Sequence, residues 1–139
     1  MTFARRLFAV AGIYGLVSLL PMFFLERRLM ERLPPALTHP EFYYGFVGVA
    51  LAWQLLFLLV AREPVRLRPV MLPAVVEKLG WGIGVLVLVA QGRIGTFFVP
   101  AALIDLLLAT LFVVAWRRLD GFPLPAEGDK LRGSARTQP

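Results

Sequence analysis

Four long apolar runs, each about 20 residues, constrain the fold of this chain more than any other feature. An α-helix rises about 1.5 Å per residue, so a run of that length crosses the roughly 30 Å hydrocarbon core of a bilayer. The 139 residues are 58% hydrophobic and 17% charged, whereas soluble domains are about a quarter charged. We therefore predict an all-α membrane protein. Its single four-helix transmembrane domain occupies residues 1–118, with spans at about 7–25, 43–61, 71–91 and 97–116.

The segments that flank the first span decide between a signal peptide and a retained helix. The basic start, Met1 to Arg6, suits either, but the apolar run is long and no small-x-small cleavage site follows it. We favour a retained span. Leu25, Leu29 and Leu33 then recur every four residues among charged residues, which predicts a short amphipathic helix on the membrane surface within 25–37. That helix is interpreted as a connector, with a docking surface or lid as the alternative.

Basic residues predict how the chain crosses the membrane. Ten lie at the amino end, in the 62–68 turn or in the carboxyl tail, and four lie in the other two loops. Loops rich in Lys and Arg stay in the cytoplasm, so both termini are predicted to be cytoplasmic in a bacterial inner membrane. The tail, residues 119–139, is rich in Pro, Gly and charge without periodicity and is predicted to be disordered.

Each span has a face of small or polar residues that suits helix packing in lipid, where close approach and polar contacts drive association. These faces are Ala11, Gly15, Ser18 and Met22; Val47, Ala50, Gln54 and Phe57; Gly80 and Gly84; and Ala101, Asp105, Ala109 and Phe112. Short connections after the second and third spans predict an up-down-up-down bundle. The Gly80/Gly84 pair is interpreted as packing within the monomer, with a homodimer or a membrane-complex partner as the alternative.

Glu77, Lys78 and Asp105 are the charged residues inside the predicted spans. A charge at the bilayer centre costs about 2.5–3.5 kcal/mol on insertion scales, so such groups face the bundle interior and find partners. Helical rise places Glu77 and Lys78 about 8–10 Å, Gln54 about 10 Å and Asp105 about 16 Å from the predicted cytoplasmic boundary. We predict a Lys78–Asp105 ion pair. The alternative is that Lys78 extends toward the headgroups and leaves Asp105 neutral.

Two aromatic residues are candidates to join this polar cluster. Glu77 points about 100° away from Lys78 around the helix, so its predicted partner is Gln54, Tyr14 or water. Trp81, one turn further on, either lies over Lys78 as a cation–π partner or packs in the core or against lipid. The cluster either fixes helix register or borders a small cavity, open to the cytoplasm, for a polar headgroup, a quinone or a proton. In a transport pathway, Glu77 and Asp105 would be the titrating groups.

Several chemistries lack the residues that they need. The chain has no cysteine and one histidine, His39, in a Pro-rich loop, which argues against thiol chemistry, a bis-histidine haem, a His-based metal site and a Ser-His-Asp triad. No phosphate-binding glycine loop and no clustered basic face for nucleic acid is present. We predict no metal and no cofactor, with a quinone as the alternative, and assign no catalytic residue.

The four spans, with polar residues at Glu77–Lys78 and Asp105, resemble the DoxX-like group of small bacterial four-helix membrane proteins over roughly residues 7–118. That resemblance implies either a link to quinone-dependent sulfur oxidation or no assigned activity. The outline is also similar to four-helix sterol-isomerase-like proteins, which handle a hydrophobic ligand. We predict an accessory or lipid-binding protein that takes a hydrophobic small molecule. The alternatives are an oxidoreductase component or isomerase-like enzyme, and a small proton-coupled transporter.

Overall fold

The computed structural model describes residues 1–32 and 39–121, and within these ranges the chain is helical and contains no strand. The helices are α1 (Thr2–Leu19), α2 (Met22–Arg32), α3 (Pro40–Arg62), α4 (Met71–Ala90) and α5 (Val99–Arg118), with single 3-10 turns η1 (Arg68–Val70) and η2 (Thr96–Phe98) before α4 and α5. The segments Thr2–Leu19, Pro40–Arg62, Arg68–Ala90 and Thr96–Arg118 are long and apolar enough to cross a membrane. The prediction of an all-α fold with four such helices is confirmed.

The first long helix lies earlier in the chain than the predicted span at 7–25. It begins at Thr2, so the basic Arg5 and Arg6 form part of its first turns, and it ends at Leu19. Pro21 accounts for this end, because proline has no N–H to donate and its ring clashes with the carbonyl four residues back. A new helix starts at once, and the Phe24 amide donates to the Pro21 carbonyl at 3.0 Å. Residues 22–25 therefore belong to α2.

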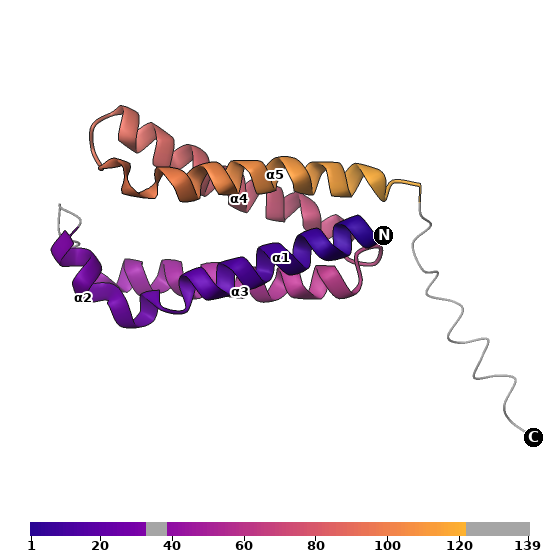
Figure 1. Ribbon diagram of the computed structural model, residues 1–139, viewed down its shortest axis with the longest axis horizontal. Helices are drawn as coiled ribbons and strands as arrows, with labels where there is room; N and C mark the ends of the chain where they lie inside the picture. The colour runs from indigo at the N-terminus through magenta and orange to yellow at the C-terminus, as the bar shows by residue number, and fades with distance from the viewer. Residues whose placement is uncertain (33–38, 122–139) are drawn as a thin grey trace, which may run out of the picture.

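Helix α2 is the predicted amphipathic helix, although it begins at Met22 rather than Leu25 and is followed from residue 33 to residue 38 by a stretch outside the described residues. Two tyrosines at the start of α3 hold it in place. The Tyr43 hydroxyl donates to the Met22 carbonyl at 2.8 Å, and the Tyr44 hydroxyl donates to Glu26 Oε2 at 2.9 Å. These bonds fix α2 at one end of the bundle (Figure 1).

The four long helices form two pairs, α1 with α3 and α4 with α5, and α1 and α5 make the main contact between the pairs. The amino end of the chain, the α3–α4 connection and the carboxyl end of α5 lie at one end of the molecule (Figure 1). Helix α2 and the α4–α5 connection lie at the other end. We call these the terminal end and the α2 end. The two helix pairs pack closely near the terminal end and are further apart near the α2 end.

An aromatic cluster joins the two pairs in the half near the terminal end. Phe8 of α1 stacks on Phe112 of α5 with ring centroids 4.2 Å apart, and Phe57 of α3 meets Phe112 edge-on at 5.2 Å. All three side chains are fully buried. Small residues surround them and let the backbones approach: Ala4, Ala11, Ala74, Ala109 and Ala115. This half of the bundle is therefore a packed core.

Glycines allow close approach inside each pair, but not at the predicted positions in α4. A Cβ added to Gly15 would lie 2.1 Å from Gln54 Oε1, so α1 and α3 meet there through an absent side chain. In α4, Gly82 approaches α5, with Leu106 Cγ at 3.0 Å from such a Cβ. Gly80 and Gly84 have nothing within 4 Å of an added Cβ. Their predicted role in packing within the chain is wrong, because they lie on the opposite side of the helix from Gly82.

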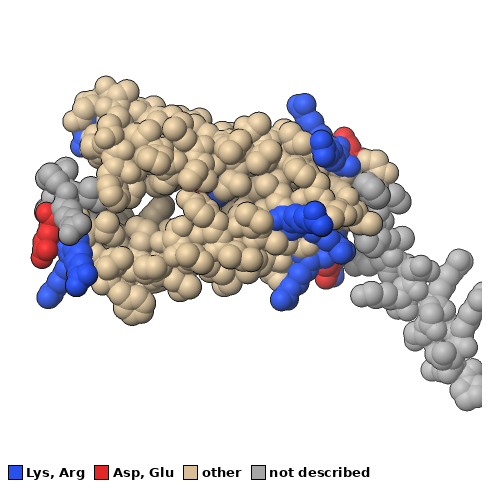
Figure 2. Space-filling view, in the orientation of Figure 1, with Lys and Arg blue, Asp and Glu red and all other residues tan. Residues whose placement is uncertain are grey.

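The outer surface is apolar in a band between two charged ends. Figure 2 shows Lys, Arg, Asp and Glu gathered at both ends of the molecule, with other residues between them. Large apolar side chains in that band are open to the outside, among them Val17 and Val76, each 69% exposed. Such a band would cost a water-soluble protein much of its stability, but it matches the hydrocarbon region of a bilayer.

Arg68 connects the α3–α4 turn to the end of α5. Its Nε donates to the Trp116 carbonyl at 3.2 Å, its guanidinium pairs with Asp120, and its Cζ lies 4.7 Å from the centre of the Trp116 ring. Leu119 is buried beside this contact. The ordered structure thus continues to residue 121, past the predicted start of the disordered tail at 119, and residues 122–139 lie outside the described part.

We expect Arg68→Ala to lower the free energy of unfolding by about 1–2 kcal/mol, because it removes a charge-assisted bond to a backbone carbonyl and a partly exposed ion pair. Arg68→Lys should recover little of this, since an ammonium lacks the planar donor fork. Unfolding in a denaturing detergent titration measures the effect. Arg66→Ala is the control: its ion pair with Glu63 is exposed, and the expected change is about 0–0.5 kcal/mol. Equal losses in both variants would contradict the prediction.

Candidate functional site

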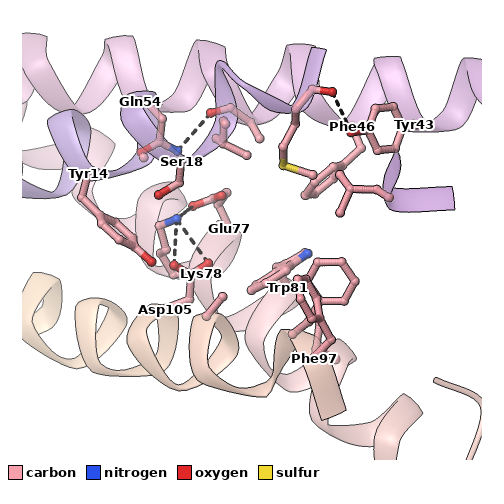
Figure 3. A pocket seen from close by; sticks show the side chains of 18 of the residues that line it. Tyr14, Ser18, Tyr43, Phe46, Gln54, Glu77, Lys78, Trp81, Phe97 and Asp105 are labelled. Carbon is pink, nitrogen blue, oxygen red and sulfur yellow. Dashed lines mark hydrogen bonds and ion pairs between the residues drawn. The ribbon is translucent and has the colours of Figure 1, made fainter. Parts of the chain in front are cut away.

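A cavity of about 460 Å³ separates the two helix pairs in the half of the bundle near the α2 end. Figure 2 shows a gap between the pairs in this half, and Figure 3 shows the side chains around it. Every long helix contributes to the wall, together with α2 and the α4–α5 connection. The lining includes Tyr14, Gly15, Ser18, Met22, Leu29, Tyr43, Phe46, Ala50, Gln54, Glu77, Lys78, Trp81, Phe97, Phe98, Ala101 and Asp105.

The predicted Lys78–Asp105 ion pair forms and lies at the inner end of this cavity. Lys78 Nζ is 3.1 Å from Asp105 Oδ1 and 3.3 Å from Oδ2, so it contacts both oxygens of the carboxylate. Both residues are buried, with 6% and 8% of their surface exposed. The ammonium also lies 5.5 Å from the centre of the Phe57 ring, which places it against the aromatic cluster of the terminal end. The pair therefore marks the boundary between packed core and cavity.

Glu77 contacts the same ammonium. The partner predicted for it from the sequence was Gln54, Tyr14 or water. Glu77 Oε2 lies 3.4 Å from Lys78 Nζ, and Figure 3 shows both carboxylates directed at the lysine. Neighbouring residues on a helix point about 100° apart, but both side chains are long enough to turn toward one another. In an apolar setting the ammonium is the strongest available partner for a carboxylate, so two acids share one base.

Gln54 belongs to the cavity wall but makes no bond to the charged residues. It is 2% exposed, and its Nε2 donates to the Ala50 carbonyl one turn back at 3.0 Å. Its Oε1 is buried against Gly15 without a hydrogen-bond donor among the described residues. Tyr14 also lines the cavity, and its ring extends toward the Lys78–Asp105 pair (Figure 3). The structure thus brings together Gln54, Tyr14, Glu77, Lys78 and Asp105, as the sequence predicted.

Aromatic side chains form the rest of the wall, and most of them were not predicted as site residues. Trp81 packs edge-on against Phe98 with centroids 6.4 Å apart, and Phe98 meets Phe97 at 5.1 Å. The aromatic ring over Lys78 is that of Phe57. Trp81 lines the cavity instead of making the suggested contact with Lys78. Phe46 lines the same space from α3. Phe46 lies one turn before Ala50 and two turns before Gln54 on the same packing face. This spacing could have identified it from the sequence.

The cavity lies on the α2 side of the charged residues. On their other side, the buried rings of Phe8, Phe57 and Phe112 pack the half near the terminal end. The lining instead includes Met22 and Leu29 of α2 and Ile94 and Gly95 of the α4–α5 connection. Depth arguments placed the polar residues correctly along the helices but gave no information on which side of them the side chains leave space.

The site combines a mostly apolar wall with three charged side chains, those of Glu77, Lys78 and Asp105. Among the described residues no group of three or more His, Cys, Asp or Glu side chains is placed to hold a metal ion. The fold and site together define a four-helix protein of membrane-spanning length with a cavity between its helix pairs. Comparisons with protein-family models, with curated proteins and with solved structures find no match. The DoxX-like resemblance stays a prediction from the outline of the sequence.

Proposed function

We propose that the protein binds a hydrophobic small molecule or lipid between its two helix pairs, as an accessory or ligand-binding protein of the bacterial inner membrane. The observation that carries this proposal is a cavity with aromatic walls that ends on a buried charged cluster. Ligand sites in proteins are mostly apolar, measure about 300–1,000 Å³ and contain a few polar groups that orient the ligand. The cavity of about 460 Å³ fits this description.

A purely structural role for the charged cluster explains less of the arrangement. A buried ion pair that only sets helix register is best surrounded by packed side chains, because each unfilled space forfeits contacts. Here Glu77, Lys78 and Asp105 all border open volume. The cluster lies between the aromatic core and the cavity and borders the cavity, as a group that meets a ligand would.

The proposed orientation gives the cavity a location in the membrane. The concentration of basic residues at the terminal end supports a cytoplasmic location for that end. The cavity then lies in the outer half of the bilayer, and the gap between the pairs gives it a side opening toward lipid (Figure 2). We infer that the ligand enters from the outer leaflet or the extracytoplasmic surface, with its apolar part between Phe46 and Phe98 and its polar end at Glu77.

Filling the cavity tests this proposal. Ala101 lines the cavity from α5, whereas Ala52 is exposed on the outer face of α3 and does not. In lipid vesicles, an alkyl probe that carries a photoreactive diazirine should label the cavity wall of the wild type, and excess unlabelled dodecanol should compete with it. We expect Ala101→Phe to weaken this saturable labelling about tenfold or more, equivalent to about 1.4 kcal/mol. Ala52→Phe should leave it unchanged.

Mass spectrometry of the labelled peptides separates the cavity from the surrounding lipid. Labelling of lipid-facing residues is expected to rise with probe concentration without saturation and to be equal in all variants. If the competed labelling is absent from the cavity wall, or if both phenylalanine variants reduce it equally, the cavity does not bind apolar ligands. Thermal unfolding of each variant verifies that the added side chain has not unfolded the bundle.

A further inference from the structure

Resting on the proposed function, we propose that the ligand has a positively charged head group and that Glu77 is the residue that pairs with it. The balance of charge in the cavity is the first observation. The charged residues of the lining are two acids, Glu77 and Asp105, and one base, Lys78. With all three ionised, the formal charge of the wall is therefore −1. A charge removed from water without a partner is strongly unfavourable, so a monovalent cation is the complement to this site.

The contacts within the cluster show which carboxylate is left to pair with a ligand. Asp105 is contacted through both oxygens, at 3.1 and 3.3 Å from Lys78 Nζ. Glu77 has one longer contact, 3.4 Å from its Oε2, and that atom makes no hydrogen bond. The Glu77 side chain is also more exposed than that of Asp105, at 18% against 12%. The excess negative charge thus lies mainly on Glu77, at the cavity surface.

The rest of the wall also suits a cation better than a carbonyl or an anion. The donors of Lys78 are directed at the two carboxylates, and Gln54 uses its Nε2 on the Ala50 carbonyl. Among the described residues, the two buried side-chain atoms without a hydrogen bond, Gln54 Oε1 and Glu77 Oε2, belong to lining residues and are both acceptors. A quinone carbonyl or a fatty-acid carboxylate would bring a further acceptor to them. An ammonium brings positive charge, and Trp81 and Tyr14, whose ring type attracts cations, line the same cavity.

Three amphiphiles with twelve-carbon chains distinguish charge from hydrophobicity. Dodecyltrimethylammonium, dodecanol and dodecanoate compete with the photoreactive alkyl probe for detergent-solubilised full-length protein, and each affinity is corrected for partitioning into the micelle. We expect the ammonium compound to bind about tenfold or more tightly than dodecanol, and dodecanoate to bind more weakly than either. Binding of dodecanol alone would support the apolar cavity of the proposed function and overturn the head-group proposal.

Variants of one residue then assign the charge to Glu77. Glu77→Gln keeps the shape and removes the charge, so the advantage of the ammonium compound over dodecanol should disappear. Glu77→Asp keeps the charge and should restore most of the advantage, which separates charge from folding. Glu63→Gln removes an exposed acid from the α3–α4 turn and is the control. An advantage that persists in Glu77→Gln, or affinities for all three amphiphiles that fall together, overturns the proposal.

Discussion

Lys78→Met is expected to lower the free energy of unfolding by about 3–5 kcal/mol, among the largest effects of any single substitution in this chain. The lysine is the shared partner of two carboxylates, and its loss leaves Glu77 and Asp105 facing each other in an apolar setting. The contact of the ammonium with the Phe57 ring is lost as well. Methionine fills a similar length, so the loss reflects charge rather than an empty volume. Unfolding in a denaturing detergent titration measures it.

Neutralising the two carboxylates that lose Lys78 as their partner should restore stability. In the Lys78→Met background, Asp105→Asn is expected to recover a substantial part of the loss, and adding Glu77→Gln should recover more, because a neutral polar group is far cheaper to bury than an ion. Arg93→Met removes a cation from the exposed α4–α5 connection and should change stability by less than about 0.5 kcal/mol. If neutralising the acids brings no recovery, the ion pairs do not account for the effect of Lys78→Met.

Gly15→Ala is expected to lower the free energy of unfolding by about 1–3 kcal/mol. The new Cβ would lie 2.1 Å from Gln54 Oε1, 2.3 Å from Cδ and 2.7 Å from Cγ, so the whole amide must move. The Gln54 amide donates to the Ala50 carbonyl at 3.0 Å and borders the cavity, so moving it out of the way breaks this hydrogen bond. Either α1 and α3 separate or the Gln54 side chain swings into the cavity.

A compensating substitution distinguishes this clash from a general intolerance of α1. Gln54→Ala removes the opposing side chain, so Gly15→Ala should cost much less in that background than in the wild type. Gly84→Ala is the matched control, because nothing lies within 4 Å of its added Cβ; there the better helix propensity of alanine should leave stability equal or slightly higher. Additive losses in the Gly15→Ala/Gln54→Ala double variant would contradict the proposed contact.

The fold was predictable where length and hydrophobicity decide the outcome. Four runs of membrane-spanning length became four long helices, and the predicted packing faces are buried at Ala11, Val47, Gln54 and Ala109. The Lys78–Asp105 pair was predictable because a buried charge needs a partner and helical rise limits the choice. The end of α1 was missed because hydrophobicity alone ignores the missing N–H of Pro21.

The site was harder to predict, because it depends on how side chains pack after the helices form. Helical spacing put Glu77 away from Lys78, yet the Glu77 carboxylate turns toward the Lys78 ammonium, which Asp105 also contacts. The close approach to a neighbouring helix that was predicted at Gly80 and Gly84 occurs at Gly82, which lies on the opposite face of the same helix. The cavity exists because the bundle is packed in the half near the terminal end and not in the half near the α2 end. No single residue determines that difference.

The two helix pairs are joined unevenly, which determines how one pair can rotate relative to the other. The stacked rings of Phe8 and Phe112 fasten the pairs at the terminal end, whereas near α2 they are separated by the cavity. A small rotation of one pair about that aromatic joint moves the far helix ends most and the Lys78 region least. On the proposed function, such a rotation would change the space for the apolar tail near α2 while the charged residues keep their spacing, so recognition of the head group and tolerance of the tail would be separable.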